Sequence, residues 1–137
     1  PDGPPSDITQ PIPFDLNIAP PEGFQASKTS TGMVLENGAR KIKLAKYPPP
    51  RPEEMSHELP AQMSTLAERD GWSAVSSQDP LKMELRDGNR KGRLLGLQGH
   101  GQDGRPFILV ALLESSGPSA NRDLNDMEQW FLGLANR

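Results

Sequence analysis

The chain lacks cysteine, is poor in aromatic residues and contains no long apolar run. Without cysteine it can form neither a disulfide framework nor a cysteine-based zinc site, and it has no thiol nucleophile. Aromatic residues make up 5% and apolar residues 34% of the 137 residues, so the core must be modest. A domain of this length still buries enough surface to fold without covalent staples. No stretch approaches the ~20 apolar residues of a membrane-spanning helix.

Proline, in contrast, is abundant, with 15 residues in the chain. Five of them fall within residues 1–13, which are predicted to form a flexible, extended leader. Residues 14–137 are predicted to form a single domain. Because the chain begins with Pro1 rather than Met, we expect an upstream segment such as a signal peptide, a lipid anchor or another domain.

Strand and helix patterns follow the leader. Residues 14–18 alternate apolar and polar side chains, which is typical of a short half-buried strand. Asn37-Gly38 separates two more strand patterns and predicts a hairpin with a type I′ turn. A first helix is predicted from apolar residues at helical spacing, which are Met55, Leu59, Met63 and Leu66. Gly71 and Trp72 fit the end of this helix, although Pro60 would kink it or delay its start. Residues 72–75 could add a short strand.

The C-terminal part shows the clearest pattern. Residues 81–86 and 93–98 are predicted strands joined by a tight turn, and residues 107–113 are continuously apolar. A continuous apolar run predicts a central strand that is covered on both faces. A closing helix follows from the spacing of Leu124, Met127, Phe131 and Leu134. The predicted fold class is therefore α+β, with a central antiparallel sheet flanked by two principal helices in the order β-ββ-α-βββ-α.

Basic residues gather around the predicted turn between residues 81–86 and 93–98. The cluster consists of Arg86, Arg90, Lys91 and Arg93, and only Asp87 offsets it. Such a cluster can dock an acidic protein or anionic lipid headgroups, or it can simply be a solvated hairpin. No aromatic residues are interleaved for base stacking, and the net charge is −3, so we expect no nucleic-acid partner.

Candidate catalytic and metal-binding residues are sparse. His100 and Asp103 lie in one glycine-rich turn and are the alternative candidates for a metal or small-ligand site, but two residues are too few ligands for a dedicated site. The serines lack a Gly-x-Ser-x-Gly elbow, and no carboxylates are paired for acid–base work. The sequence thus predicts a protein that is not an enzyme, with no cofactor and no metal.

Two turn motifs and the order of elements carry a family resemblance. The motifs are Pro21-Glu22-Gly23-Phe24, after the first predicted strand, and Asp103-Gly104-Arg105-Pro106-Phe107, before the long apolar strand. In residues 14–137 the chain resembles the Mog1/PsbP-like family, from which it departs in its proline-rich leader and in Pro60. The resemblance implies a sheet between helices and an accessory or interaction role, as in photosystem subunits, a GTPase-binding factor and envelope lipoproteins. It implies no shared catalytic residues.

The predicted function is a non-enzymatic accessory or protein-interaction domain of the bacterial cell envelope. The expected location is periplasmic or lipid-anchored, with residues 1–13 acting as a tether, and a cytoplasmic location stays open. The expected partner is a protein that binds the basic cluster. The alternatives are a small-ligand or metal-binding protein and a cytoplasmic assembly factor or chaperone of the same fold.

Overall fold

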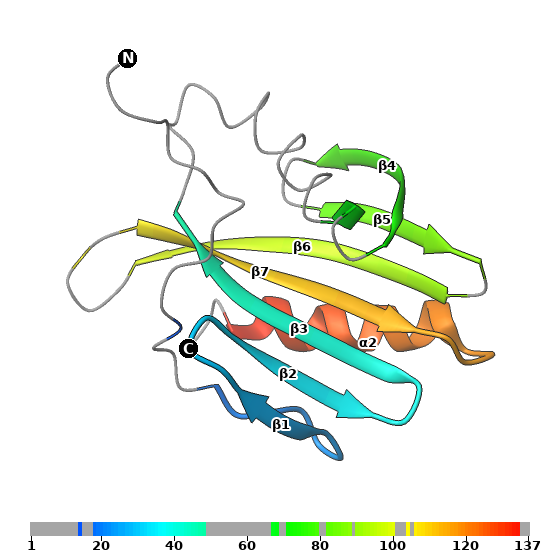
Figure 1. Ribbon diagram of the computed structural model, residues 1–137, viewed down its shortest axis with the longest axis horizontal. Coiled ribbons are helices and arrows are strands. Elements are labelled where there is room, and N and C mark those ends of the chain that lie inside the picture. Colours follow the sequence, from blue (N-terminus) through cyan, green and yellow to red (C-terminus); the bar gives the residue numbers. More distant parts are fainter. Residues whose placement is uncertain are drawn as a thin grey trace.

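In the part of the chain that the computed structural model describes, one antiparallel sheet of seven strands dominates, and one long helix lies along one of its faces (Figure 1). The structure describes residues 14, 18–48, 67–68, 71–79, 82–88, 90–100, 104 and 106–134. The strands are β1 (Gln25–Lys28), β2 (Gly32–Asn37), β3 (Arg40–Tyr47), β4 (Ser73–Asp79), β5 (Lys82–Asp87), β6 (Arg90–His100) and β7 (Pro106–Ser115). The helix is α2 (Ala120–Gly133). No helix in these described segments is long and apolar enough to span a membrane.

The spatial order of the strands is β1-β2-β3-β7-β6-β5-β4. Strand β7 therefore occupies the centre, where it pairs antiparallel with β3 on one side and with β6 on the other. The predicted three-strand run in the C-terminal part is confirmed, because β5, β6 and β7 are successive neighbours.

Side chains of β7 alternate between two apolar clusters. Leu109 and Leu113 belong to the cluster on the α2 face, which includes Phe131 of the helix. Ile108 and Leu112 belong to the cluster on the opposite face, together with Trp72. The continuous apolar run of β7 thus reflects burial on both sides, as predicted for a central strand.

The predicted fold class is wrong in its balance of helix and sheet. The described residues contain one principal helix instead of two, and the fold is mainly β. Two edge strands, β1 and β4, extend the sheet beyond the five strands that had clear patterns. All four residues of β1 are exposed, so this strand has no alternating apolar pattern that sequence reasoning could detect.

Of the predicted first helix, only the end is described. Met55, Leu59, Met63 and Leu66 lie outside the described residues, as does Pro60. Ala67 and Glu68 are helical, and Gly71 has a φ of 85°. Gly71 N–H donates to the Glu68 carbonyl at 3.0 Å, and Trp72 N–H donates to the Ala67 carbonyl at 3.0 Å. These two bonds form a Schellman motif, so the predicted helix end is confirmed.

The first described strand is β1, and the strand predicted at residues 14–18 lies mostly outside the described residues. Phe14 and Ile18 lie in no strand, and residues 15–17 are outside the described residues. Phe14 is buried in the α2-face cluster, Ile18 packs against that cluster, and Phe14 N–H donates to the Ser30 carbonyl at 2.9 Å. The apolar spacing of these residues therefore reflects packing onto the core rather than strand pairing.

The hairpin between β2 and β3 is confirmed, but its turn is not the predicted one. Asn37 pairs with Arg40, so the two central turn residues are Gly38 and Ala39. Gly38 has a φ of 62°, and no described residue other than glycine has a positive φ. A glycine at the first central position fits a type II′ turn, whereas type I′ would need positive φ at both central positions.

Candidate functional site

The β5–β6 hairpin carries the basic cluster, but the pleat of the strands sends its members to different faces. Arg90 lies on the face of the sheet that holds Trp72. Lys91 and Arg93 lie on the α2 face, where both contact the helix. Arg86 is the cross-strand partner of Lys91 and shares that face. Because successive side chains of a strand alternate, neighbours in the sequence cannot form one patch here.

Arg90 is held by three contacts within the fold. Its guanidinium lies 4.2 Å from the centroid of the Trp72 ring. Its Nη2 donates to Asp87 Oδ2 at 2.6 Å, and its Nη1 donates to Glu114 Oε1 at 3.2 Å. The hydrogen bond to Asp87 is the main reason why the pKa of Arg90 is raised, against a smaller lowering by burial. Arg90 therefore covers Trp72 and stays positively charged.

Arg93 joins the sheet to the helix. Its side chain is only 11% exposed. Nη1 donates to Glu128 Oε1 at 2.6 Å and to Asn125 Oδ1 at 2.9 Å. Nε lies 2.7 Å from Glu84 Oε2 but makes no hydrogen bond, so this contact is a Coulombic ion pair. Lys82 Nζ, 3.3 Å from Glu128 Oε2, completes the network. The positive charge of Arg93 is therefore balanced by carboxylates of the same chain and is not available to a partner.

The start of α2 is anchored to the end of β7 through Ser115. Ser115 is fully buried, and its hydroxyl donates to Asp123 Oδ2 at 2.9 Å. The Ser115 hydroxyl oxygen also accepts a hydrogen bond from Gly117 N–H at 3.4 Å. Because Ser115 is also the cross-strand partner of Lys91, this anchor holds the first turn of the helix beside the hairpin.

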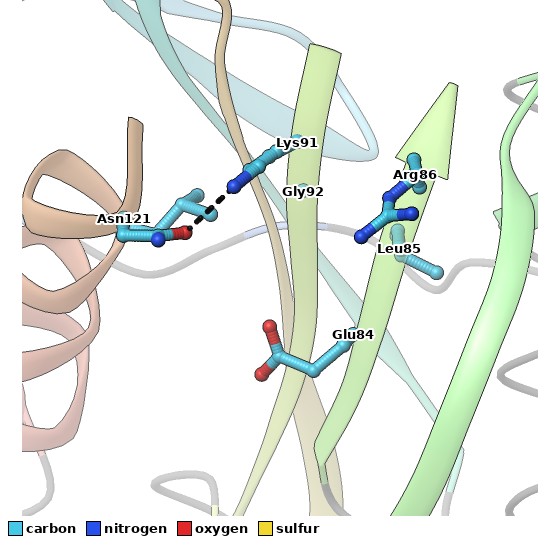
Figure 2. Close-up of a pocket in the computed structure, with 7 residues that line it drawn as sticks. Glu84, Leu85, Arg86, Lys91, Gly92 and Asn121 are labelled. Atoms are coloured by element: carbon cyan, nitrogen blue, oxygen red, sulfur yellow. Dashed lines mark hydrogen bonds between the residues drawn. The ribbon is translucent and has the colours of Figure 1, made fainter. Parts of the chain in front are cut away.

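A pocket of about 260 Å³ lies between this first turn and the hairpin. Its lining residues are Glu84, Leu85, Arg86, Lys91, Gly92, Asn121 and Leu124. Figure 2 shows Lys91 reaching from β6 to α2, where its Nζ donates to Asn121 Oδ1 at 3.3 Å. The side chains of Arg86 and Glu84 project from β5 at the same site (Figure 2). Like charges that face each other across two strands repel, so the pair of Arg86 and Lys91 favours an anion in the pocket.

The histidine candidate lies far from this pocket. His100 is exposed at the end of β6, nine residues beyond Lys91, which is about 30 Å at the usual rise of a strand. Asp103, its proposed companion, lies outside the described residues. Within the described part of the chain, no three His, Asp or Glu side chains are grouped to hold a metal ion.

Sequence reasoning missed the wall that the helix contributes to the pocket. The sequence patterns mark Leu124 only as an apolar residue of the closing helix and give Asn121 no role. Both line the pocket opposite β5 and β6. No pattern in the sequence links residues 86–91 with residues 121–124, because their proximity depends on how α2 packs on the sheet.

Comparison with known proteins adds no relative. No protein-family model matches this chain, and neither the curated proteins nor the solved structures yield a match. The resemblance to the Mog1/PsbP-like family therefore stays a prediction from turn motifs and element order.

Proposed function

We propose that this chain is a non-enzymatic protein-interaction domain, an accessory component that binds a partner protein through the β5–β6 hairpin on the α2 side. The observation that carries the proposal is the pair of Arg86 and Lys91 at the pocket. Arg86 is exposed and Lys91 is half-buried, and they face each other across the strands. The other two members of the basic cluster are committed to contacts within the fold.

The partner surface in this proposal is narrower than the basic cluster of the sequence. Arg90 stacks on Trp72 and Arg93 bridges to Glu128, so substituting either one would disturb folding as well as binding. Arg86 and Lys91 can be changed with less structural consequence. They are therefore the two positions at which binding is best tested.

As part of the same proposal, the domain belongs to the bacterial cell envelope, either periplasmic or lipid-anchored. The support is the proline-rich composition of residues 1–13, which suits a tether, and the resemblance to a family with envelope members. The encoded sequence upstream of Pro1 tests this placement. We expect an apolar segment there that ends in a cysteine or in a signal-peptidase site. If the upstream sequence instead encoded another domain without any export signal, the envelope location would be wrong.

Site-specific photo-crosslinking in cells of the source organism tests the interaction itself. A photoreactive phenylalanine analogue at the exposed position 125 of α2, one turn after Asn121, leaves both Arg86 and Lys91 in place and is expected to give a discrete crosslinked band of higher mass. The same analogue at Lys41, on the opposite face of the sheet, is the matched control and is expected to give none. The band should disappear when Lys91→Glu is added. Equal bands at positions 125 and 41, or a band that survives Lys91→Glu, would refute this binding surface.

A further inference from the structure

The pocket beside α2 combines two cations with one carboxylate in a small, open space. Arg86 and Lys91 approach it from neighbouring strands, and Lys91 is oriented by its hydrogen bond to Asn121. Glu84 lines the same pocket, two residues from Arg86 along β5, and its side chain is 40% exposed. Leu124 lines the pocket from the helix but is only 1% exposed. This lining is complementary to a short side chain that ends in a single negative charge.

We propose that the pocket binds the carboxylate of one aspartate or glutamate side chain from an acidic segment of the partner protein. This inference rests on the proposed function and specifies its recognition chemistry. The Arg86 guanidinium can bind a carboxylate with two parallel hydrogen bonds, and the Lys91 ammonium supplies a second, adjacent positive charge.

The charge balance of the lining favours a carboxylate over a phosphate. A phosphate monoester carries a charge of about −1.5 to −2 near neutral pH, whereas a carboxylate carries −1. Arg86 and Lys91 attract a phosphate more strongly than a carboxylate, and Glu84 repels it more strongly. A bound phosphate would, however, leave an excess negative charge next to Glu84, and this repulsion has no balancing cation among the lining residues. Arg93 lies 2.7 Å from Glu84 and offsets only part of this repulsion, because it is also paired with Glu128. Two cations against one carboxylate leave a net charge that suits a monoanion.

The size of the pocket also points to a side chain rather than to a whole small molecule. A volume of about 260 Å³ lies below the ~300–1,000 Å³ that is typical of small-ligand sites. The site is formed at the junction of a hairpin and a helix, and it opens to solvent beside the exposed end of β5. A partner segment can therefore pass over the hairpin and insert one residue.

Titration of the ¹⁵N-labelled protein with short peptides, followed by NMR, tests this proposal at low ionic strength. The probe is an acetylated octapeptide in which three glutamates alternate with glycines. Two further peptides carry glutamine or phosphoserine at the same three positions. We expect saturable shifts of the amides of Arg86, Lys91, Gly92 and Asn121 with the glutamate peptide. We expect none with the glutamine peptide and weaker binding of the phosphoserine peptide.

Three variants locate the binding in the pocket. Arg86→Gln and Lys91→Gln should each weaken binding of the glutamate peptide by roughly tenfold, since each removes a charged hydrogen-bond donor. Asn121→Phe keeps the net charge but fills the pocket, so it should abolish binding of the glutamate peptide. The control, Lys41→Gln, removes the same charge from the opposite face and should leave the affinity unchanged. Thermal unfolding of each variant verifies that it is folded.

The possible outcomes separate this inference from the proposed function. If the peptide binds equally well to Asn121→Phe and to the wild type, or if phosphoserine binds more tightly than glutamate, the carboxylate pocket is wrong, whatever the crosslinking shows. If the glutamate peptide binds in the pocket but position 125 crosslinks to no partner in cells, the pocket stands and the proposed cellular role fails. An absence of saturable shifts with every peptide overturns the inference.

Discussion

Replacing Trp72 with alanine is expected to lower the free energy of unfolding by about 3–5 kcal/mol, the usual cost of removing a large aromatic side chain from a core. Trp72 is 3% exposed and belongs to the apolar cluster on the face opposite α2. It lies over Gly92 of β6, where an added Cβ would come within 2.9 Å of the indole ring. The Arg90 guanidinium stacks on this ring. The variant loses all of these contacts at once and leaves a cavity above the sheet.

Urea denaturation followed by circular dichroism measures this loss without relying on the fluorescence of the removed tryptophan. Gly92→Ala is a second, independent variant, because it displaces the indole without removing it, and we expect a cost of about 1–3 kcal/mol. Leu132→Ala is the control, since Leu132 is 38% exposed on α2, and it should change stability by less than about 1 kcal/mol. If Trp72→Ala lowered the free energy of unfolding no more than Leu132→Ala does, the packing of Trp72 against Gly92 would be wrong.

Replacing Arg93 with methionine is expected to lower the free energy of unfolding by about 2–4 kcal/mol. Methionine keeps most of the length of the side chain but removes the positive charge between Glu84 and Glu128. Glu128 is 13% exposed and, among the described residues, would keep Lys82 alone as an ionic partner. Removing one member of a buried ion pair is costly because the remaining charge stays desolvated. The contact between α2 and the β5–β6 part of the sheet should loosen as a result.

A double-mutant cycle with Glu128→Gln measures the coupling of the two residues. We expect the double variant to be less destabilised than the sum of the single variants, because it leaves one fewer uncompensated charge. Arg86→Met is the matched control, as it removes the same kind of charge from an exposed position on the neighbouring strand, and it should be nearly neutral. Equal costs for Arg93→Met and Arg86→Met, together with additive single effects, would show that Arg93 does not link helix and sheet.

The parts of the fold that sequence reasoning predicted correctly have strong apolar patterns. The run in β7 predicted a strand buried on both faces, and the spacing of Leu124, Met127 and Phe131 predicted the buried side of α2. The edge strand β1 escaped prediction for the opposite reason, whereas the short strand expected at residues 72–75 overlaps the start of β4 (Ser73–Asp79). Strand β1 is exposed at every residue, so its place in the sheet depends on backbone pairing with β2 rather than on burial.

The hairpin turn between β2 and β3 shows how a correct motif can be misplaced by one residue. Asn-Gly is the usual signal for a type I′ turn. Here Asn37 is the last paired residue of β2, because that register brings Leu35 opposite Ile42 and Met33 opposite Leu44 on the buried face. Burial of the apolar pairs therefore determines the register, and the turn adapts with Gly38 at its first central position.

Composition and apolar spacing are enough to predict a small core, a chain without cysteine chemistry, a central apolar strand, a closing amphipathic helix and a basic hairpin. Which basic residues remain available to a partner depends on how the strands and the helix pack together. The alternation of strand side chains sends Arg90 to Trp72, and the packing of α2 binds Arg93 to Glu128. These contacts are long-range, and no local pattern encodes them. Arg86 and Lys91 are left to face the pocket because their neighbours in the sequence serve the fold.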